Sequence, residues 1–277
     1  TLGEGYMEWH YTVAAQTDAG TTKAVNQDSL VVKVINTIYG EAAFAVICDG
    51  MGGLEQGEVA SSTVVRAYER WFLRDFPQIL SRGFSEETLE QVWNWLANDC
   101  NNRIRNYRKT KNAAMGTTLT AVLLIGGRYY ISHIGDCRVY VMGNGMEQLT
   151  SDQTYVAREV SLGHMTPEQA QNDARRNVLL QCIGMVGNVI PDFSMGDLYA
   201  GDSFLLCSDG FRHYLTEVEL YDYCHTALEG LPWLLAKRLE NSHIMNNQLK
   251  SLIEANKQRG ERDNISVILI KVTNTVE

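Results

Sequence analysis

Residues 121–145 have the sequence AVLLIGGRYYISHIGDCRVYVMGNG, in which two turn signals separate apolar stretches. Gly126 and Gly127 are the only residues between AVLLI and RYYISHI. Two glycines in that position favour a tight primed turn, and therefore an antiparallel hairpin. The GNG segment at 143–145 predicts a second turn of the same kind after RVYVM. Adjacent antiparallel strands argue against a Rossmann fold or a (β/α)₈ barrel, whose parallel strands need helical crossovers.

Further elements follow from the hydrophobic periodicity on either side of this segment. Apolar residues recur at helical spacing over about 55–76 and 86–109, and Ser85 is a suitable N-cap for the second helix. Pro232 is expected to open another helix. Because strands and helices arrive in runs rather than in alternation, we expect an α+β fold. The predicted strands lie at about 9–17, 29–38, 41–48, 116–125, 128–134, 137–142, 202–208 and 264–272.

The composition limits the class of protein. Of the 277 residues, 45% are hydrophobic, and with only four prolines no linker divides the chain, so we expect residues 1–277 to form a single domain. The formal net charge of −9 gives no electrostatic footprint for nucleic acid or an anionic membrane. No apolar run reaches the roughly 18–20 residues of a membrane span. The first ten residues lack a secretory signal, and the six cysteines form no CxxC. We therefore expect a reduced, cytoplasmic protein.

Three aspartates stand at the ends of apolar strand-like segments. Asp49-Gly50 follows AFAVIC, Asp209-Gly210 follows SFLLCS, and Asp263 precedes NISVILIKV. Their carboxylates should emerge at the edge of a core, where burial without compensation costs several kcal/mol. A divalent cation would offset that cost, and oxygen ligands favour Mg²⁺ or Mn²⁺ over Zn²⁺. A single Asp-Gly pair is more often only a turn, and the adjacent Gly52-Gly53 is weak support by itself.

The order of eight motifs makes metal binding the better interpretation. In this respect the sequence resembles the metal-dependent, protein phosphatase 2C-like phosphatases, in particular their compact bacterial branch, over roughly residues 10–273. The motifs are TDAGTTKAVNQDS (17–29), VICDGMGG (46–53), GTTLTAVLL (116–124), HIGDCRVYVM (133–142), LTSDQT (149–154), RNVLLQCIG (176–184), GDSFLLCSDG (201–210) and RDNISVILIKV (262–272).

The resemblance implies both a fold and a metal centre. Members of this family form a four-layer αββα sandwich, in which two stacked antiparallel sheets carry helix pairs on both outer faces. The matching motifs imply that Asp49 bridges two Mn²⁺ or Mg²⁺ ions and that the Gly50 carbonyl binds one of them. Asp209 and Asp263 would complete the other ion. Asp28 would hold metal-bound waters.

A third ion and a phosphate contact are implied less directly. In bacterial members the Asp of the H-x-G-D motif helps to bind a weaker third metal, which points to Asp136. The family usually holds the substrate phosphate with an Arg, but Lys23 occupies that position. Lys can bind phosphate as a point charge without the bidentate fork of Arg. The alternative is that Lys23 is an ordinary solvated loop residue.

Other departures concern proton transfer and a mobile flap expected at about 154–190. Met51 replaces a His that is often proposed as general acid in animal members, and a thioether cannot donate a proton. His133 is a conceivable substitute, although a structural hydrogen bond is the commoner role for a strand histidine. In the flap region, Gln153-Thr154 replaces His-Ser and Leu180-Gln181 replaces Thr-Arg. These changes bear on substrate preference rather than on catalysis.

The implied activity is hydrolysis of phosphoserine and phosphothreonine in proteins by a metal-bridging hydroxide. The expected partners are phosphoprotein targets of a Ser/Thr kinase, with no nucleic acid and no membrane, and we expect a monomer. Two alternatives remain open at this point. One is a phosphatase for small phosphate esters or a specialised regulator. The other is a non-catalytic phosphoprotein-binding relative, which should have lost a metal aspartate, whereas this chain retains them all.

Overall fold

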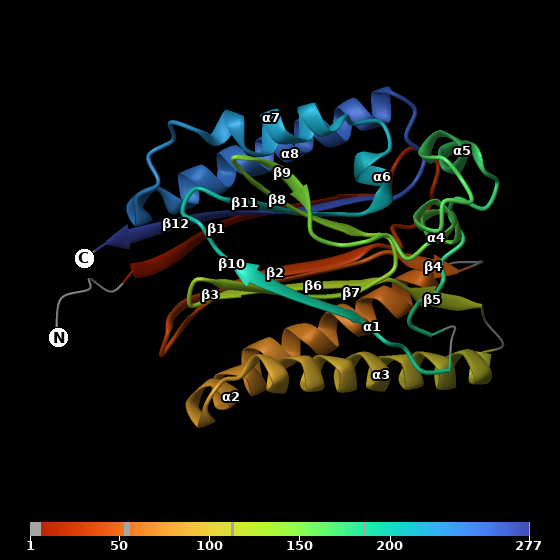
Figure 1. Cartoon of the computed structure of the whole chain (residues 1–277), viewed down its shortest axis with the longest axis horizontal. Helices are drawn as coiled ribbons and strands as arrows, with labels where there is room; N and C mark the ends of the chain where they lie inside the picture. The colour runs from red at the N-terminus through yellow and green to blue at the C-terminus, as the bar shows by residue number, and fades with distance from the viewer. Residues whose placement is uncertain (1–6, 53–55, 112–113, 185–186, 277) are drawn as a thin grey trace.

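Two five-stranded antiparallel sheets stack face to face in the computed structural model, which describes residues 7–52, 56–111, 114–184 and 187–276 (Figure 1). In the first sheet the spatial order is β1 (Met7–Asp18), β12 (Ile265–Val276), β11 (Ser203–Cys207), β8 (Arg138–Gly143) and β9 (Gly145–Gln148). In the second it is β10 (Asp192–Asp197), β7 (Arg128–Ile134), β6 (Leu119–Ile125), β3 (Gly40–Cys48) and β2 (Ser29–Thr37). A small ribbon pairs β4 (Gly50–Gly52) with β5 (Met115–Thr117).

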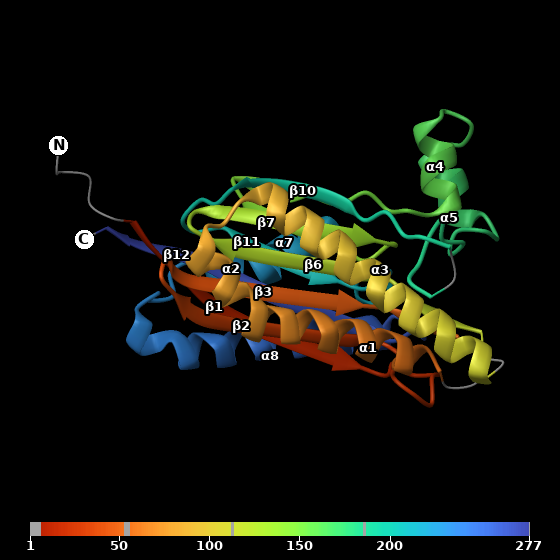
Figure 2. The ribbon, with the colours of Figure 1, turned by 90° about the horizontal axis from the view of Figure 1, so that it is seen from below.

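Helices cover both outer faces, so the αββα layering expected from the resemblance is confirmed (Figure 1). The second sheet is covered by α1 (Gly57–Arg70), the π-helical segment Trp71–Asp75, α2 (Phe76–Arg82) and α3 (Glu86–Lys111). The first sheet is covered by α7 (Glu217–Cys224) and α8 (Arg238–Gln258). Two short helices, α4 (Tyr155–Ser161) and α5 (Pro167–Asn172), stand at one end of the sandwich in the expected flap (Figure 2). The remaining short helices are α6 (Asp209–Arg212), Thr226–Leu228 and Leu235–Lys237.

Strand β3 shows how the layers share the core. Its alternate residues Phe44 and Val46 pack toward the helices, whereas Ala45 and Ile47 pack toward the other sheet. A central strand of a four-layer sandwich is covered on both faces, which explains why its sequence is continuously apolar rather than alternating.

No helix among the described residues is long and apolar enough to cross a membrane.

The predicted hairpins are present. β6 and β7 pair across Gly126 and Gly127, whose φ angles of 58° and 78° lie in the left-handed region that glycine favours. β8 and β9 pair across the turn at 143–145. Ser85 caps the third helix by accepting a hydrogen bond from the Thr88 backbone N–H.

Several boundaries differ from the prediction. Pro232 does not open a helix: α8 begins at Arg238, because Trp233 instead packs against the core beneath the first sheet. The expected strand at 116–125 is interrupted at Thr118, whose hydroxyl accepts a hydrogen bond from the backbone N–H of Asp49, directly after β3. Strand β10 was not predicted, since the alternation in DFSMGD rests on only two apolar residues, Phe193 and Met195. The division of residues 1–277 into one domain with a flap stays a prediction.

The core predicts a sharp contrast between two neighbouring tryptophans of α3. Trp93 is fully buried among Phe44, Tyr68 and Trp71, whereas Trp95 is 66% exposed. Trp93→Ala should lower the free energy of unfolding by about 3–5 kcal/mol, because it leaves a large cavity. Trp95→Ala, the matched control, should change it by no more than about 0.5 kcal/mol. Urea denaturation followed by circular dichroism measures both, and equal losses would contradict this account of the core.

Candidate metal centre

The predicted acidic residues meet at one end of the sandwich, where β3 leads into β4 and β11 leads into α6 (Figure 1). In the second sheet the pairing of Ser29 with Cys48 sets Asp28 beside Asp49. In the first sheet, Ser208 donates a backbone hydrogen bond to Ser266, which sets Asp209 close to the start of β12. We call the five residues the acidic cluster: Asp28, Asp49, Asp136, Asp209 and Asp263.

Burial and mutual repulsion perturb these carboxyls. Burial, together with the charges of Asp209 and Asp263, raises the pKa of Asp28 to about 7. Burial and the charge of Asp209 likewise raise the pKa of Asp136 to about 7. Loss of solvation raises the pKa of Asp49 well above its usual range, and the charges of the other four aspartates raise it further. The charges of the other four residues all act on Asp49, which places the five in one electrostatic unit.

The buried oxygens of this cluster lack partners. Both carboxylate oxygens of Asp28, and Oδ1 of Asp209, are buried without a partner in good hydrogen-bonding geometry, although the Ser266 and Ser208 hydroxyls are near enough to Asp28 to lower its pKa in part. Such groups are costly unless they are paired or coordinate a cation. Asp49 and Asp263 keep a partly exposed surface, so the cluster is accessible from solvent. The residues present therefore fit a divalent cation.

Backbone contacts fix the position of Asp49. Its carbonyl accepts hydrogen bonds from the Thr117 hydroxyl and the Thr118 N–H, both at 2.9 Å. Its own N–H donates to the Thr118 hydroxyl at 2.8 Å. At Gly50 a Cβ would lie 2.2 Å from the Gln27 carbonyl oxygen and 2.4 Å from that of Gly57, so only glycine fits. Gly53, the second glycine of the Gly52-Gly53 pair in DGMGG, lies outside the described residues.

Two members of the cluster have partners of their own. Among the described residues, no three His, Cys, Asp or Glu side chains are placed so that they could already hold a metal ion, so the carboxylates would have to turn toward a bound cation. Asp263 instead pairs with Lys23 at 3.1 Å, and Asp209 lies 3.6 Å from His213. Lys23 thus lies at the cluster. Although burial lowers its pKa, the hydrogen bond to Asp263 and the charges of Asp263, Asp49 and Asp209 raise it above its usual value overall.

His213 and Glu261 were not predicted from the sequence. Glu261 is buried and accepts hydrogen bonds from the backbone N–H groups of Arg262 and Asp263. His213 Nδ1 lies 2.9 Å from its carboxylate, and this hydrogen bond raises the pKa of the imidazole. The two residues therefore join the segments that carry Asp209 and Asp263. The four-residue spacing of Asp209 and His213 was the only signal available in the sequence.

Comparison with known proteins assigns the family. The family model for Protein phosphatase 2C matches residues 16–254. This chain belongs to the protein phosphatase 2C family. The resemblance inferred from the eight motifs is thereby confirmed.

The relatives of this phosphatase 2C-family chain include several bacterial proteins. The serine/threonine protein phosphatase PstP of Mycobacterium tuberculosis is 31% identical over 261 residues, which cover 94% of this chain and 44% of that protein. The chain thus spans less than half the length of that relative. A solved serine/threonine phosphatase from S. agalactiae has a TM-score of 0.77 at 25% identity, covering 95% of this chain and 99% of that one. The catalytic domain of PstP in complex with two manganese ions has a TM-score of 0.72 at 28% identity, covering 96% and 99%.

In the flap region, two residues that differ from the usual phosphatase 2C pattern, Gln153 and Gln181, are hydrogen-bonded to each other. Gln153 accepts hydrogen bonds from the Gly135 N–H and from the Gln181 side chain, both at 3.0 Å. Its amide also donates to Asp192 at the start of β10, at 2.8 Å. Thr154 caps α4 by accepting from the Ala157 N–H. Gln153 and Gln181 therefore tie the root of the flap to the loop that carries Asp136.

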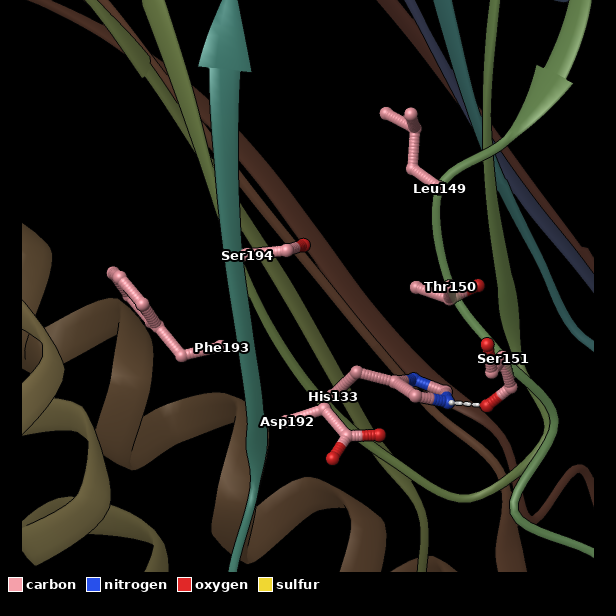
Figure 3. Close-up of a pocket in the computed structure, with 7 residues that line it drawn as sticks. All are labelled: His133, Leu149, Thr150, Ser151, Asp192, Phe193 and Ser194. Carbon is pink, nitrogen blue, oxygen red and sulfur yellow. Dashed lines mark hydrogen bonds between the residues drawn. The ribbon is translucent and has the colours of Figure 1, made fainter.

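His133 has a structural role. Its Nδ1 lies 2.9 Å from the Thr120 hydroxyl, and its Nε2 lies 3.1 Å from the Ser151 carbonyl oxygen (Figure 3). Burial lowers the pKa of this imidazole. It lines a cavity of about 310 Å³ with Asp192, Phe193 and the segment 149–151, and no member of the acidic cluster lines that cavity. Both ring nitrogens are already engaged, so the structural interpretation of His133 holds.

The repulsion within the acidic cluster predicts an unusual stability change. Asp49→Asn removes one of several like charges, so it should raise the melting temperature of the EDTA-treated protein by a few degrees. Mn²⁺ at a hundred times its dissociation constant should stabilise the unaltered protein by about 2.7 kcal/mol, but should leave the variant unchanged. Thermal melting measures both effects. Asp202→Asn, which alters a buried acid outside the cluster, should keep the Mn²⁺ response. A destabilised Asp49→Asn that still responds to Mn²⁺ would rule out a shared cation at this cluster.

Proposed function

We propose that this chain is a Mn²⁺- or Mg²⁺-dependent protein phosphatase that removes phosphate from phosphoserine and phosphothreonine. The observation that carries the proposal is the acidic cluster, whose Asp28 and Asp209 keep buried carboxylate oxygens without partners. Oxygen ligands of this kind suit Mn²⁺ and Mg²⁺. The names of the relatives agree, since they are serine/threonine phosphatases and one was solved with two manganese ions.

Each member of the cluster has a proposed role. Asp49 would bridge two ions, and the Gly50 carbonyl would bind one of them. Asp209 and Asp263 would complete the other, and Asp28 would hold bound waters. In support, Asp28 and Asp49 flank β2 and β3 of the second sheet, whereas Asp209 and Asp263 flank β11 and β12 of the first, so ligands reach the centre from both sheets.

A weaker third ion is proposed beside Asp136. This carboxyl is buried near Asp209, and its pKa is raised to about 7 by burial and by that neighbour. Two carboxylates at such a position repel unless a cation lies between them. Fewer protein ligands would reach this ion than reach the bridging pair, which is why weaker binding is expected.

When bound, two such ions lower the pKa of a shared water, supply a hydroxide for in-line attack on phosphorus and offset charge on the phosphoryl oxygens. The residues of the chain position the substrate. Lys23 is proposed to leave Asp263 and hold a phosphate oxygen once Asp263 turns to its cation. Met51 cannot protonate the departing serine or threonine alkoxide, and both nitrogens of His133 are engaged elsewhere, so the proton would come from water.

The proposed substrates are phosphoproteins made by a Ser/Thr kinase. A cytoplasmic location and a monomeric state remain predictions. The two rival functions differ in measurable ways. A phosphatase for small esters would turn over aryl phosphates but not phosphoproteins, and a non-catalytic relative would bind phosphopeptides without releasing phosphate.

The central test is phosphate release from phosphoserine, phosphothreonine and phosphotyrosine peptides with and without Mn²⁺. We expect turnover of the first two that depends on Mn²⁺. Asp209→Asn should reduce kcat by at least about a hundredfold while circular dichroism stays unchanged. Asp222→Asn, an exposed acid on α7, is the matched control and should keep full activity. Near-complete activity of Asp209→Asn would refute the metal assignment, and exclusive turnover of phosphotyrosine would refute the substrate class.

The phosphate contact has a closely matched control. Lys23 and Lys33 are both 44% exposed and each pairs with a carboxylate at 3.1 Å, but Lys33 pairs with Glu69, outside the acidic cluster. Lys23→Ala should raise KM for a phosphopeptide roughly tenfold, because it removes a charge-assisted hydrogen bond present before the transition state. Lys23→Arg should retain or improve affinity, and Lys33→Ala should leave KM unchanged. Equal KM values for Lys23→Ala and Lys33→Ala would return Lys23 to the role of a solvated loop residue.

A further inference from the structure

The last turns of α3 carry the densest group of positive charges in the chain. Five basic residues fall within nine positions, and neither Asp nor Glu occurs between Asp99 and Asp136. The chain as a whole has a formal net charge of −9. We call these five residues the α3 basic end: Arg103, Arg105, Arg108, Lys109 and Lys111.

The α3 basic end projects beyond the core at the same end of the molecule as the acidic cluster. The buried residues of α3 stop at Ile104, and Lys109 and Lys111 are exposed. Four residue steps after Lys111 the chain enters β5, so the helix end lies within about 14 Å of that strand. β5 pairs with β4, which directly follows Asp49. Figures 1 and 2 both show α3 reaching the end of the sandwich that carries the flap.

Helix stability and local contacts do not use all of this charge. A helix C-terminus carries only about half a negative charge, which one basic residue satisfies. Arg103 pairs with Asp99 at 2.7 Å within the same helix. Arg105 donates to the Gly187 carbonyl at 2.8 Å and Arg108 donates to that of Gly184, and these two bonds hold the last part of the flap segment. Lys109 and Lys111 add exposed charge at the tip.

We propose that the α3 basic end binds an acidic stretch of the phosphoprotein substrate, on one side of the phosphorylated residue. The proposal rests on the proposed function and deepens it by naming a substrate class: phosphoproteins that carry Asp, Glu or a second phosphate near the scissile one. Charge complementarity supports it, since a protein of net charge −9 repels acidic segments elsewhere on its surface. Asp49 is three residues before Gly52, which pairs with Met115, so the basic end lies within roughly 25–30 Å of the cluster. An extended peptide advances about 3.3 Å per residue, so acidic residues up to about eight positions from the phosphoresidue should reach it.

The test compares three phosphothreonine peptides that are identical around the phosphate. One has four Glu residues four to eight positions before it, one has them after it, and one has Gln at all of these positions. The unaltered protein should show a KM roughly tenfold lower for one of the acidic peptides than for the Gln peptide at low salt. Lys109→Gln with Lys111→Gln should remove most of this difference, and Lys109→Glu with Lys111→Glu should reverse it. At 0.5 M NaCl the preference should shrink, because salt screens exposed charges.

The matched control is Arg70→Glu with Arg74→Glu, which makes the same change in net charge. Both residues are exposed and lie about 20–25 Å along the helix from Gly57, where α1 begins next to Gly50. This control should keep the preference. Turnover of a small aryl phosphate, which cannot reach α3, should be equal in all variants. If the unaltered protein turns over neither the aryl phosphate nor the peptides, the proposed function is refuted. If it turns over all three peptides with equal KM values, only the α3 docking site is refuted. Binding of duplex DNA that the lysine variants lose, with no peptide preference, would assign the surface to nucleic acid and overturn the proposal.

Discussion

Repulsion among the carboxylates of the acidic cluster is the constraint on which the site depends. Isolated aspartates would retreat toward solvent, but here two stacked sheets hold them in place. Strand β3 is buried on both faces, and Thr117 and Thr118 fix the backbone of Asp49 from a neighbouring segment. Gly50 leaves no room for a side chain between Gln27 and Gly57. The rigidity of the sandwich therefore keeps charges together that would otherwise separate, and a bound cation would restore the balance.

The same constraint shapes how an anionic substrate can approach. A strongly negative site on a negatively charged protein repels phosphate unless positive charge is supplied locally. Lys23 provides one charge directly at the cluster, through its pair with Asp263. The α3 basic end provides a larger, peripheral group at the same end of the molecule. Bound cations would supply the rest, which is consistent with a family relative solved with two manganese ions.

The departures from the family pattern are coupled rather than independent. Gln153 and Gln181 are the residues that replace a His and an Arg, and in the structure they bond each other. Together they join β10, the flap root and the loop of Asp136. His213 and Glu261 form a second such pair, 48 positions apart, between the segments that carry Asp209 and Asp263. Pairs of this kind cannot be found from one sequence, because neither partner is informative without the other.

The sequence by itself determined the elements and the ends of strands at which the acids lie. The glycine turns at 126–127 and 143–145 predicted their hairpins correctly, because φ > 0 is a local requirement. The apolar segments ending at Asp49 and Asp209 predicted buried strands with acids at their ends, because hydrophobic patterning is also local. Only the tertiary structure decided that Pro232 stays outside α8, that Lys23 lies against Asp263, and that His213 contacts Glu261. Those outcomes depend on which surfaces meet across the sandwich, and the packing energy of such long-range contacts is not encoded in the periodicity of any one segment.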